Sequence, residues 1–476
     1  MSLSSIFFLF LFFPITLAVY YFARLIGSDK AWASTLGKGI LLVASLCFYA
    51  WAAFEYIPHL LVVSLLVYAL ALLMGKREGT ARKLVLALGI VVCVAFLMFY
   101  KYLDFFGGIA GRIFNISYED AGIIQPLGIS FLVFSLISYL IDVYRSKISA
   151  DKNVLNVLLW SFFFVKITSG PIVRYDQMYK PEENNPSKPC LEDISAGARR
   201  FVIGLAKKVI LANTLGLTVD TIFAAQPDGI SMSVAWLGII CYTFQIYLDF
   251  AGYSDMALGM ARMLGFHFEE NFDYPYVSKT LGEFWRRWHI SLSTWLRDYL
   301  YFPLGGSRRG NVYFNLVVVF LISGLWHGAS LHFVAWGAWY GLFMIIDRLY
   351  RTYIQPKRKL PLWLTWLFTI VVVVFGWVLF RADGMSQAVS YMLNLVGVGV
   401  DTNYAWGIRY YLDNRVIAFL VISVVLSTPL FKKLSERFGN TVPWQLCRTI
   451  GIPVLFLISA MFVLSTDYSP FMYAQF

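Results

Sequence analysis

Runs of about 20 apolar residues, each long enough to cross about 30 Å of hydrocarbon as a helix, recur from near residue 5 to near residue 466. Hydrophobic residues fill 59% of the 476 positions and charged residues only 14%. A soluble domain has about 45–50% apolar and about 25% charged residues. Because a helix satisfies its own backbone groups in lipid, we predict an all-α polytopic membrane protein with about 11–13 apolar helices, some of them re-entrant.

The distribution of charge indicates how the chain lies in a bilayer. Lys and Arg number 39 against 28 Asp and Glu, and many basic residues stand in short connections. Such a pattern is typical of loops that face the cytoplasm and anionic lipid, so we expect the lipid bilayer as a partner and no nucleic acid. Lys76, Arg77, Arg82 and Lys83 share one short loop after three predicted spans. This places the loop inside and the amino terminus outside the cytoplasm.

The organisation of the chain favours a single membrane domain over residues 1–476, because the sequence has no internal repeat and no linker between soluble domains. The five cysteines have no paired spacing, so neither a disulfide framework nor a metal site is expected. Motifs of zinc proteases and serine hydrolases, HExxH and GxSxG, do not occur.

Two histidines stand directly after tryptophans, His289 after Trp288 and His327 after Trp326. His327 lies inside the apolar run from Val312 to Tyr340. A polar side chain at such a place needs a reason, and a neutral imidazole there exchanges a proton with little competition from water. A satisfied structural histidine is the alternative. The other histidines stand near predicted span ends or after a Gly-Phe pair and are expected to be structural: His59, His267 and His332.

The segment from Thr280 to Ser307 is too charged to cross lipid, but its apolar residues recur at helical spacing. Five of them are predicted to share one helix face: Phe284, Trp288, Leu292, Trp295 and Tyr299. Arg286, Arg287 and Arg297 are then available for water, lipid headgroups or a phosphate-bearing donor. Taken alone, the segment is interpreted as an interfacial anchor.

Two carboxylates, Asp249 and Asp255, lie in or beside an apolar run, where an unpaired charge is costly. We favour helix pairing or capping for both over a catalytic role.

Four contiguous motifs follow one another in a specific order: residues 245–257 (QIYLDFAGYSDMA), 270–276 (ENFDYPY), 283–306 and 324–329 (GLWHGA). Through them, and through its opening and closing apolar stretches, the chain resembles the membrane-bound O-acyltransferase (MBOAT) family. The similarity is to the bacterial branch that includes the membrane subunit of alginate O-acetylation, and it covers essentially the whole chain. It departs from the pattern at Tyr340, where many relatives carry histidine, so no role is assigned to a third histidine.

The resemblance implies an MBOAT-like fold with a central substrate tunnel and a catalytic core segment at residues 240–345. It identifies His327 with the family histidine, expected to be the base, and His289 with a supporting position upstream. Five residues become weaker candidates for donor binding: Arg286, Arg287, Arg297, Trp288 and Trp326.

The function implied is transfer of an acyl group, expected to be acetyl, from a cytoplasmic thioester such as acetyl-CoA or another acyl thioester across the bacterial inner membrane. An extracytoplasmic polysaccharide receives it through a separate exported acetyltransferase or polysaccharide-modifying partner. No bound cofactor and no metal are expected. Two other classes stay open: a histidine-lined transporter or proton-coupled channel, and a scaffold for an envelope polymer complex.

Overall fold

The computed structural model describes residues 2–26, 31–179, 190–226, 229–400 and 406–465, and all regular structure within these ranges is helical. The chain divides into two compact units. Unit 1 comprises Met1–Phe201, Asp255–Glu269 and Tyr473–Phe476, and unit 2 comprises Val202–Ser254 and Glu270–Met472. The all-α prediction is thereby confirmed. The single domain over residues 1–476 stays a prediction, as does the tunnel.

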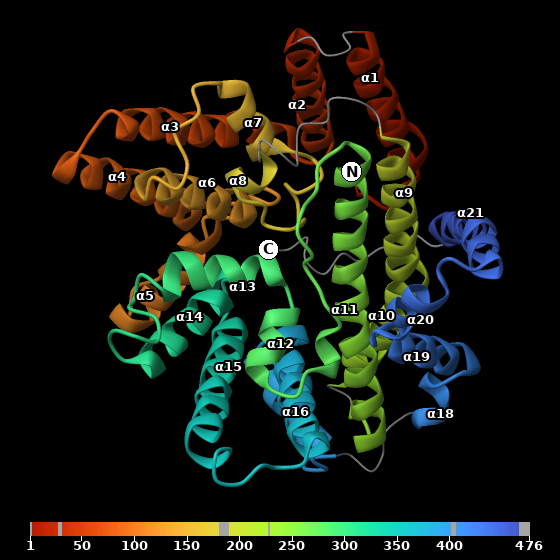
Figure 1. The fold of residues 1–476 in the computed structure, drawn as a ribbon. Helices are drawn as coiled ribbons and strands as arrows, with labels where there is room; N and C mark the ends of the chain where they lie inside the picture. The colour runs from red at the N-terminus through yellow and green to blue at the C-terminus, as the bar shows by residue number, and fades with distance from the viewer. Residues whose placement is uncertain (1, 27–30, 180–189, 227–228, 401–405, 466–476) are drawn as a thin grey trace. The chain divides into compact units, whose positions relative to one another are not determined.

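Unit 1 is built from the amino-terminal helices (Figure 1). Their bounds are α1 Phe13–Ile26, α2 Ala31–Ala53, α3 Ile57–Gly75, α4 Gly79–Leu97, α5 Leu103–Phe114, α6 Ile129–Tyr144, α7 Val154–Phe162 and α8 Tyr175–Met178. Helices α3, α4 and α6 pack on one another, and α2 packs on α1 and α7. Helix α7 begins where the Asn153 side chain accepts a hydrogen bond from the backbone N–H of Leu155.

Two helices contribute residues to both units, α9 Leu191–Ala206 and α11 Met232–Met263. The helices of unit 2 are α10 Asn213–Ala225, α12 Leu281–Arg287, α13 Ile290–Leu296, α14 Val312–His327, α15 Leu331–Leu349, α16 Leu362–Arg381, α17 Met385–Leu395, α18 Ile408–Tyr411, α19 Asn414–Leu426, α20 Leu430–Phe438 and α21 Val442–Ser465. Within this unit α15 packs along α14 and α16 (Figure 1).

Seven helical stretches of the described chain are long and apolar enough to cross a membrane. The pair α19 and α20, bent by 62° at a short break, makes an eighth if it is one broken span. The multi-pass prediction is therefore confirmed. The prediction of 11–13 apolar helices included re-entrant helices, so it exceeds the number of stretches able to span. Two apolar helices that are too short for the count of spans are α6 and α14, with 16 residues each. Sixteen residues rise about 24 Å, which is less than the hydrocarbon thickness.

Asp249 and Asp255 both have basic partners, as their position in an apolar helix requires. The Asp249 carboxylate lies 2.5 Å from Nζ of Lys208, and both side chains are at most 2% exposed. Asp255 pairs with Arg200 at 2.9 Å. The first pair joins α11 to the turn of π-helix at Lys207–Ala212, and the second joins α11 to α9. The predicted helix-pairing role is confirmed for both carboxylates.

Candidate active site

His327 is the last residue of α14 and is 2% exposed. Its ring contacts three other rings, with centroid separations of 4.9 Å to Trp326, 4.8 Å to Trp336 and 5.4 Å to Phe380. Nδ1 lies 2.6 Å from the main-chain oxygen of Ser323. A carbonyl oxygen only accepts, so Nδ1 carries a proton, and in the neutral ring Nε2 is the nitrogen able to take one up.

Glycines bring α14 and α15 close together beside His327. A Cβ on Gly324 would lie 2.3 Å from the main-chain oxygen of Phe333, and one on Gly337 would lie 2.4 Å from that of Phe320. The backbone at Gly328 is extended, which ends α14 directly after the histidine. Glycines at these two positions therefore allow the backbones of α14 and α15 to approach closely.

His289 lies at a break between α12 and α13 instead of within one helix. Trp288 is extended and His289 has a left-handed backbone with φ 43° and ψ 57°. Residues from Phe284 to Tyr299 were predicted to share one helix face, and this prediction is wrong because the break at His289 divides them between two helices. Helix α12 begins after Thr280, whose hydroxyl accepts a hydrogen bond from the Glu283 N–H at 3.1 Å.

The His289 side chain is 1% exposed and packs edge-on against Phe250, with ring centroids 4.7 Å apart. Its ring centroid is 6.2 Å from that of Trp326, which also contacts His327. Nδ1 of His289 lies 3.2 Å from Oδ1 of Asn271. Burial lowers the pKa of His289 well below its usual range, and the neighbouring His327 lowers this pKa further, so the ring is neutral.

The two histidines therefore belong to one set of rings in unit 2. We call this set the aromatic cluster: Phe250, His289, Trp326, His327, Trp336 and Phe380. The residues predicted to share an apolar face between 280 and 307 are buried despite the helix break: Phe284, Trp288, Leu292, Trp295 and Tyr299. Trp326, a predicted donor-binding residue, lies inside the cluster. Trp288 packs instead on Trp377, with centroids 4.8 Å apart.

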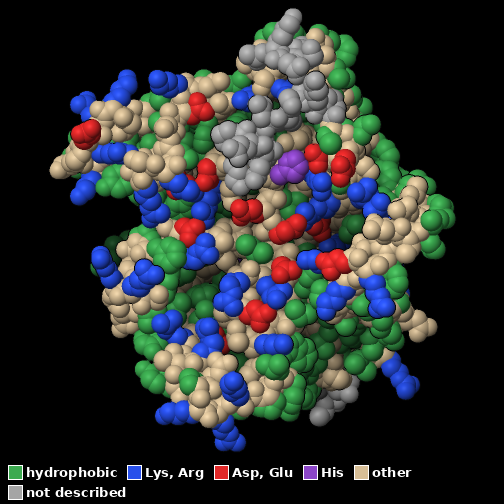
Figure 2. All heavy atoms as spheres, in the orientation of Figure 1, with side chains coloured by type: hydrophobic (Ala, Val, Ile, Leu, Met, Phe, Trp, Pro, Cys, Tyr) green, Lys and Arg blue, Asp and Glu red, His purple; other side chains and the backbone are tan. Residues whose placement is uncertain are grey.

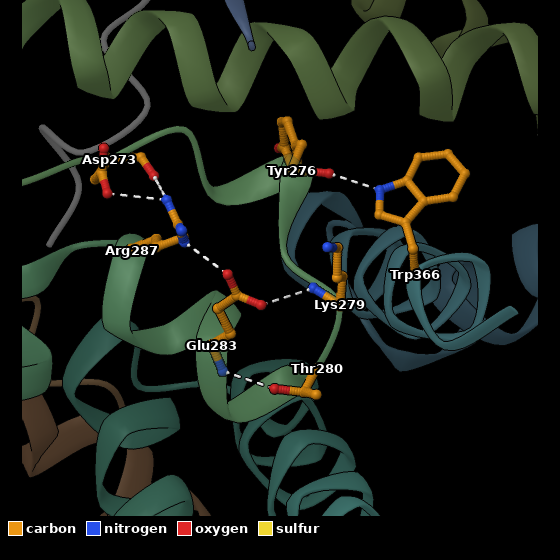
Figure 3. Close-up of polar contacts among 7 residues, drawn as sticks. All are labelled: Asp273, Tyr276, Lys279, Thr280, Glu283, Arg287 and Trp366. Carbon is orange, nitrogen blue, oxygen red and sulfur yellow. Dashed lines mark hydrogen bonds and ion pairs between the residues drawn. The ribbon is translucent and has the colours of Figure 1, made fainter. Parts of the chain in front are cut away.

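Arg287 is held by two acidic residues of its own neighbourhood (Figure 3). Its NH1 atom lies 2.9 Å from the Asp273 carboxylate and 3.0 Å from the Asp273 main-chain oxygen. Its Nε atom lies 3.1 Å from the Glu283 carboxylate. These hydrogen bonds connect Asp273, which precedes α12, to Arg287 at the end of that helix. Arg287 therefore has a structural role beside the candidate site.

Arg297 and Arg286 are both exposed. Arg297 pairs with the adjacent Asp298 at 2.8 Å and lies over the Phe302 ring, whereas Arg286 makes no hydrogen bond or ion pair within the described residues. Figure 2 shows that Lys and Arg side chains lie among Asp and Glu side chains on the face it presents. Of the three predicted arginines, Arg286 is the one that forms no ion pair in the described chain, although its charge acts on the nearby Asp347 carboxylate.

The other histidines lie outside the aromatic cluster. His59 is exposed, His267 lies 3.3 Å from Asp193, and Nδ1 of His332 lies 2.8 Å from Ser330 Oγ. Tyr340, at the position where a third histidine was considered, is fully buried and donates its hydroxyl proton to the Val373 carbonyl at 3.3 Å. In the described part of the chain, no group of three or more His, Cys, Asp and Glu side chains could hold a metal ion.

Asn271 is the neighbour of the candidate site that sequence reasoning missed. It is fully buried, bonds to Nδ1 of His289, and donates from Nδ2 to Ser254 Oγ at 2.9 Å. The sequence contained a signal, since Asn271 belongs to the motif at 270–276, but its partner lies 18 residues away. Nothing in local spacing connects the two.

The described chain thus combines helices able to cross a membrane with two imidazoles buried among aromatic rings, which suits proton transfer inside a membrane protein. Residues 94–385 match the membrane-bound O-acyltransferase family, and the chain belongs to this family. It is an O-acyltransferase.

Three relatives show the range of acceptors in this family. The chain is 37% identical to the probable alginate O-acetylase AlgI of Pseudomonas putida over 100% of both chains. It is 31% identical to the peptidoglycan O-acetyltransferase of Helicobacter pylori over 98% of this chain and 96% of that one. It is 28% identical to the teichoic acid D-alanyltransferase of Bacillus subtilis over 54% of this chain and 69% of that one. The names of these relatives state different acceptors. They therefore support acyl transfer as the reaction, but they do not select one acceptor.

Proposed function

We propose that this protein moves an acetyl group from a cytoplasmic thioester, acetyl-CoA or another acyl thioester, towards an extracytoplasmic polysaccharide. His327 is the base and His289 supports it. The observation that carries the proposal is the bond from His327 Nδ1 to the Ser323 carbonyl, which makes Nε2 the nitrogen that accepts a proton in a ring that is only 2% exposed.

In the transfer step, the oxygen of an acceptor hydroxyl bonds to the acyl carbon while the hydroxyl proton passes to Nε2 of His327. The carbon–sulfur bond then breaks, and the departing sulfur takes the proton back from the imidazolium. Base catalysis of this kind contributes about 10²–10⁴-fold to the rate. His289, a neutral ring in the same aromatic cluster, adds an acceptor nitrogen without adding charge to the site.

The acceptor hydroxyl of this step belongs either to the polysaccharide or to a separate exported partner that passes the acetyl group on. We propose residence in the bacterial inner membrane with the amino terminus outside the cytoplasm. Three apolar helices precede the connection between α3 and α4, and four basic residues lie in this connection or in the first turns of α4: Lys76, Arg77, Arg82 and Lys83. We propose Arg286 as the donor-binding arginine, because its guanidinium forms no ion pair within the described residues and a guanidinium pairs well with phosphate.

The test is consumption of acetyl-CoA by the purified full chain in detergent, where no ion gradient exists. Hydrolysis of the donor and acetyl transfer to an added oligosaccharide both proceed without an ion gradient, so consumption of acetyl-CoA above the background of a His327→Ala protein is expected. A transporter or channel would consume no donor under these conditions. If the purified chain leaves acetyl-CoA intact and, in liposomes, moves protons or solute down a gradient, the proposed function is wrong.

A further inference from the structure

The left-handed backbone at His289 is held from both sides by the segment that begins at Asn271. Before the histidine, the Asp273 N–H donates to the Arg287 carbonyl at 3.0 Å. After it, the Ile290 N–H donates to the Asn271 carbonyl at 2.9 Å. A non-glycine residue seldom adopts this conformation, so the surrounding bonds must determine it. These two backbone hydrogen bonds therefore hold His289 in position.

The hydrogen bonds of Asn271 leave one orientation of its amide. The Ser291 N–H lies 3.1 Å from Oδ1, and an N–H can only donate, so the atom facing it is the oxygen. The Ser291 hydroxyl donates to the same oxygen at 2.9 Å. On the other side, Nδ2 donates to Ser254 Oγ at 2.9 Å. A flipped amide would place two donors face to face at Ser291, so the assignment follows from the backbone.

The same oxygen lies 3.2 Å from Nδ1 of His289. Ser291 Oγ also lies 3.5 Å from Nδ1, but this hydroxyl gives its proton to Oδ1 of Asn271 in the shorter bond of 2.9 Å. An amide oxygen cannot donate, so Nδ1 carries the proton in its bond to Asn271. We propose that Asn271 is a positioning residue for the transfer reaction, holding His289 as the Nδ1–H tautomer so that Nε2 serves as a hydrogen-bond acceptor. The inference rests on the proposed function for its catalytic consequence, but the tautomer itself can be tested without activity.

This tautomer restricts what His289 can do. With Nδ1–H bonded to Asn271 and a neutral ring, Nε2 has a lone pair and no proton, so it cannot donate a hydrogen bond to a thioester carbonyl. It can accept one from a hydroxyl. Because His327 is held through Nδ1 in the same manner, both rings are suited to a hydroxyl acceptor, and stabilisation of the carbonyl oxygen must come from another donor.

The direct measurement is solid-state ¹⁵N NMR of the full chain in lipid, labelled in its five histidines. The His289 signals are assigned by their loss in His289→Gln. The expected result is a protonated Nδ1 and an unprotonated Nε2 in the wild type, with the tautomers mixed in Asn271→Ala. A protonated Nε2 in the wild type, or an unchanged tautomer in Asn271→Ala, overturns the proposal. The expected tautomer in a chain that does not consume acetyl-CoA would instead overturn the proposed function.

Kinetics give a second test with a matched control. Asn271→Ala is expected to lower kcat at least about 10- to 100-fold, the range found when a hydrogen-bond partner that orients a metal-bound histidine is removed, with little change in donor KM. Asn315→Ala removes another buried asparagine, whose Nδ2 donates to the Gly306 carbonyl at 3.0 Å, and should keep kcat within a few-fold of the wild type. Equal losses in the two variants would overturn the positioning role.

Asn271→Asp separates positioning from packing. The carboxylate still accepts the bond from Nδ1–H, but its charge raises the pKa of His289. As the pH falls through this raised pKa, the ring becomes charged and Nε2 loses its lone pair, so activity is lost at low pH and regained at higher pH. The wild type, whose His289 pKa is lowered by burial, should show no such loss until a lower pH. Identical pH profiles of the two proteins would contradict the proposal.

Discussion

Nδ1 of His327 lies 2.6 Å from the main-chain oxygen of Ser323, four residues earlier in α14. The bond can form because a helical side chain leans back over the preceding turn, which brings the His327 ring to the carbonyl four residues earlier. It fixes which nitrogen of the imidazole is protonated. The bond to Ser323 therefore leaves Nε2 of His327 as the nitrogen that can act as the base.

The contact between α14 and α15 predicts that Gly324 tolerates no side chain. In Gly324→Ala the new Cβ would meet the Phe333 carbonyl, so the helices must separate, at a cost of about 1–3 kcal/mol, and His327 one turn later moves with them. We expect a lower unfolding temperature in detergent and reduced acyl transfer. Gly39→Ala in α2, whose Cβ would meet nothing within 4 Å, is the control. Unchanged stability of Gly324→Ala would contradict the packing argument.

His289 is predicted to act through a hydrogen bond and not through its charge. His289→Ala removes the acceptor nitrogen, whereas His289→Asn retains a polar group, so the asparagine variant should keep more activity than the alanine variant. Single-turnover acetyl transfer at equal amounts of folded protein measures both. If the alanine variant equals the wild type, His289 does not belong to the site.

The arginines are predicted to differ because their surroundings differ. Arg286→Gln removes a guanidinium that forms no ion pair in the described chain, so it should raise the donor KM with little change in protein yield. Arg287→Gln breaks bonds to Asp273 and Glu283 and should lower the yield or stability of the protein. Arg297, paired with its neighbour Asp298, should show the smaller effect of an exposed ion pair, about 0–1 kcal/mol. Equal KM values for wild type and Arg286→Gln would leave the anchor interpretation as the correct one.

The loop between α3 and α4 is predicted to face the cytoplasm, because basic residues are retained on that side. A single cysteine replacing exposed Lys76, in a chain from which the five native cysteines have been removed, should resist a membrane-impermeant maleimide in intact cells. It should react after permeabilisation. Ready labelling in intact cells would invert the topology and the side from which the donor enters.

The sequence was sufficient to predict the helical membrane class, since no other fold accommodates so many apolar runs in lipid. It also predicted the pairing of Asp249, because an apolar helix cannot leave a carboxylate unpaired. The helix break at His289 was missed. Local periodicity favours a continuous helix there, and the bonds that override it come from the segment at Asn271, distant in sequence. For the same reason Arg287 was predicted to be available for a donor, although Asp273 already binds it.

The central claim is that His327 is the base of acyl transfer, and His327→Ala in the purified chain tests it most directly. The substitution removes the proton acceptor without adding charge to α14, so membrane insertion should be retained. His332→Gln, which alters a histidine outside the aromatic cluster, is the matched control. We predict that acetyl-CoA consumption falls about 10²–10⁴-fold in His327→Ala and stays near the wild-type rate in His332→Gln. Consumption by folded His327→Ala at the wild-type rate would contradict the account.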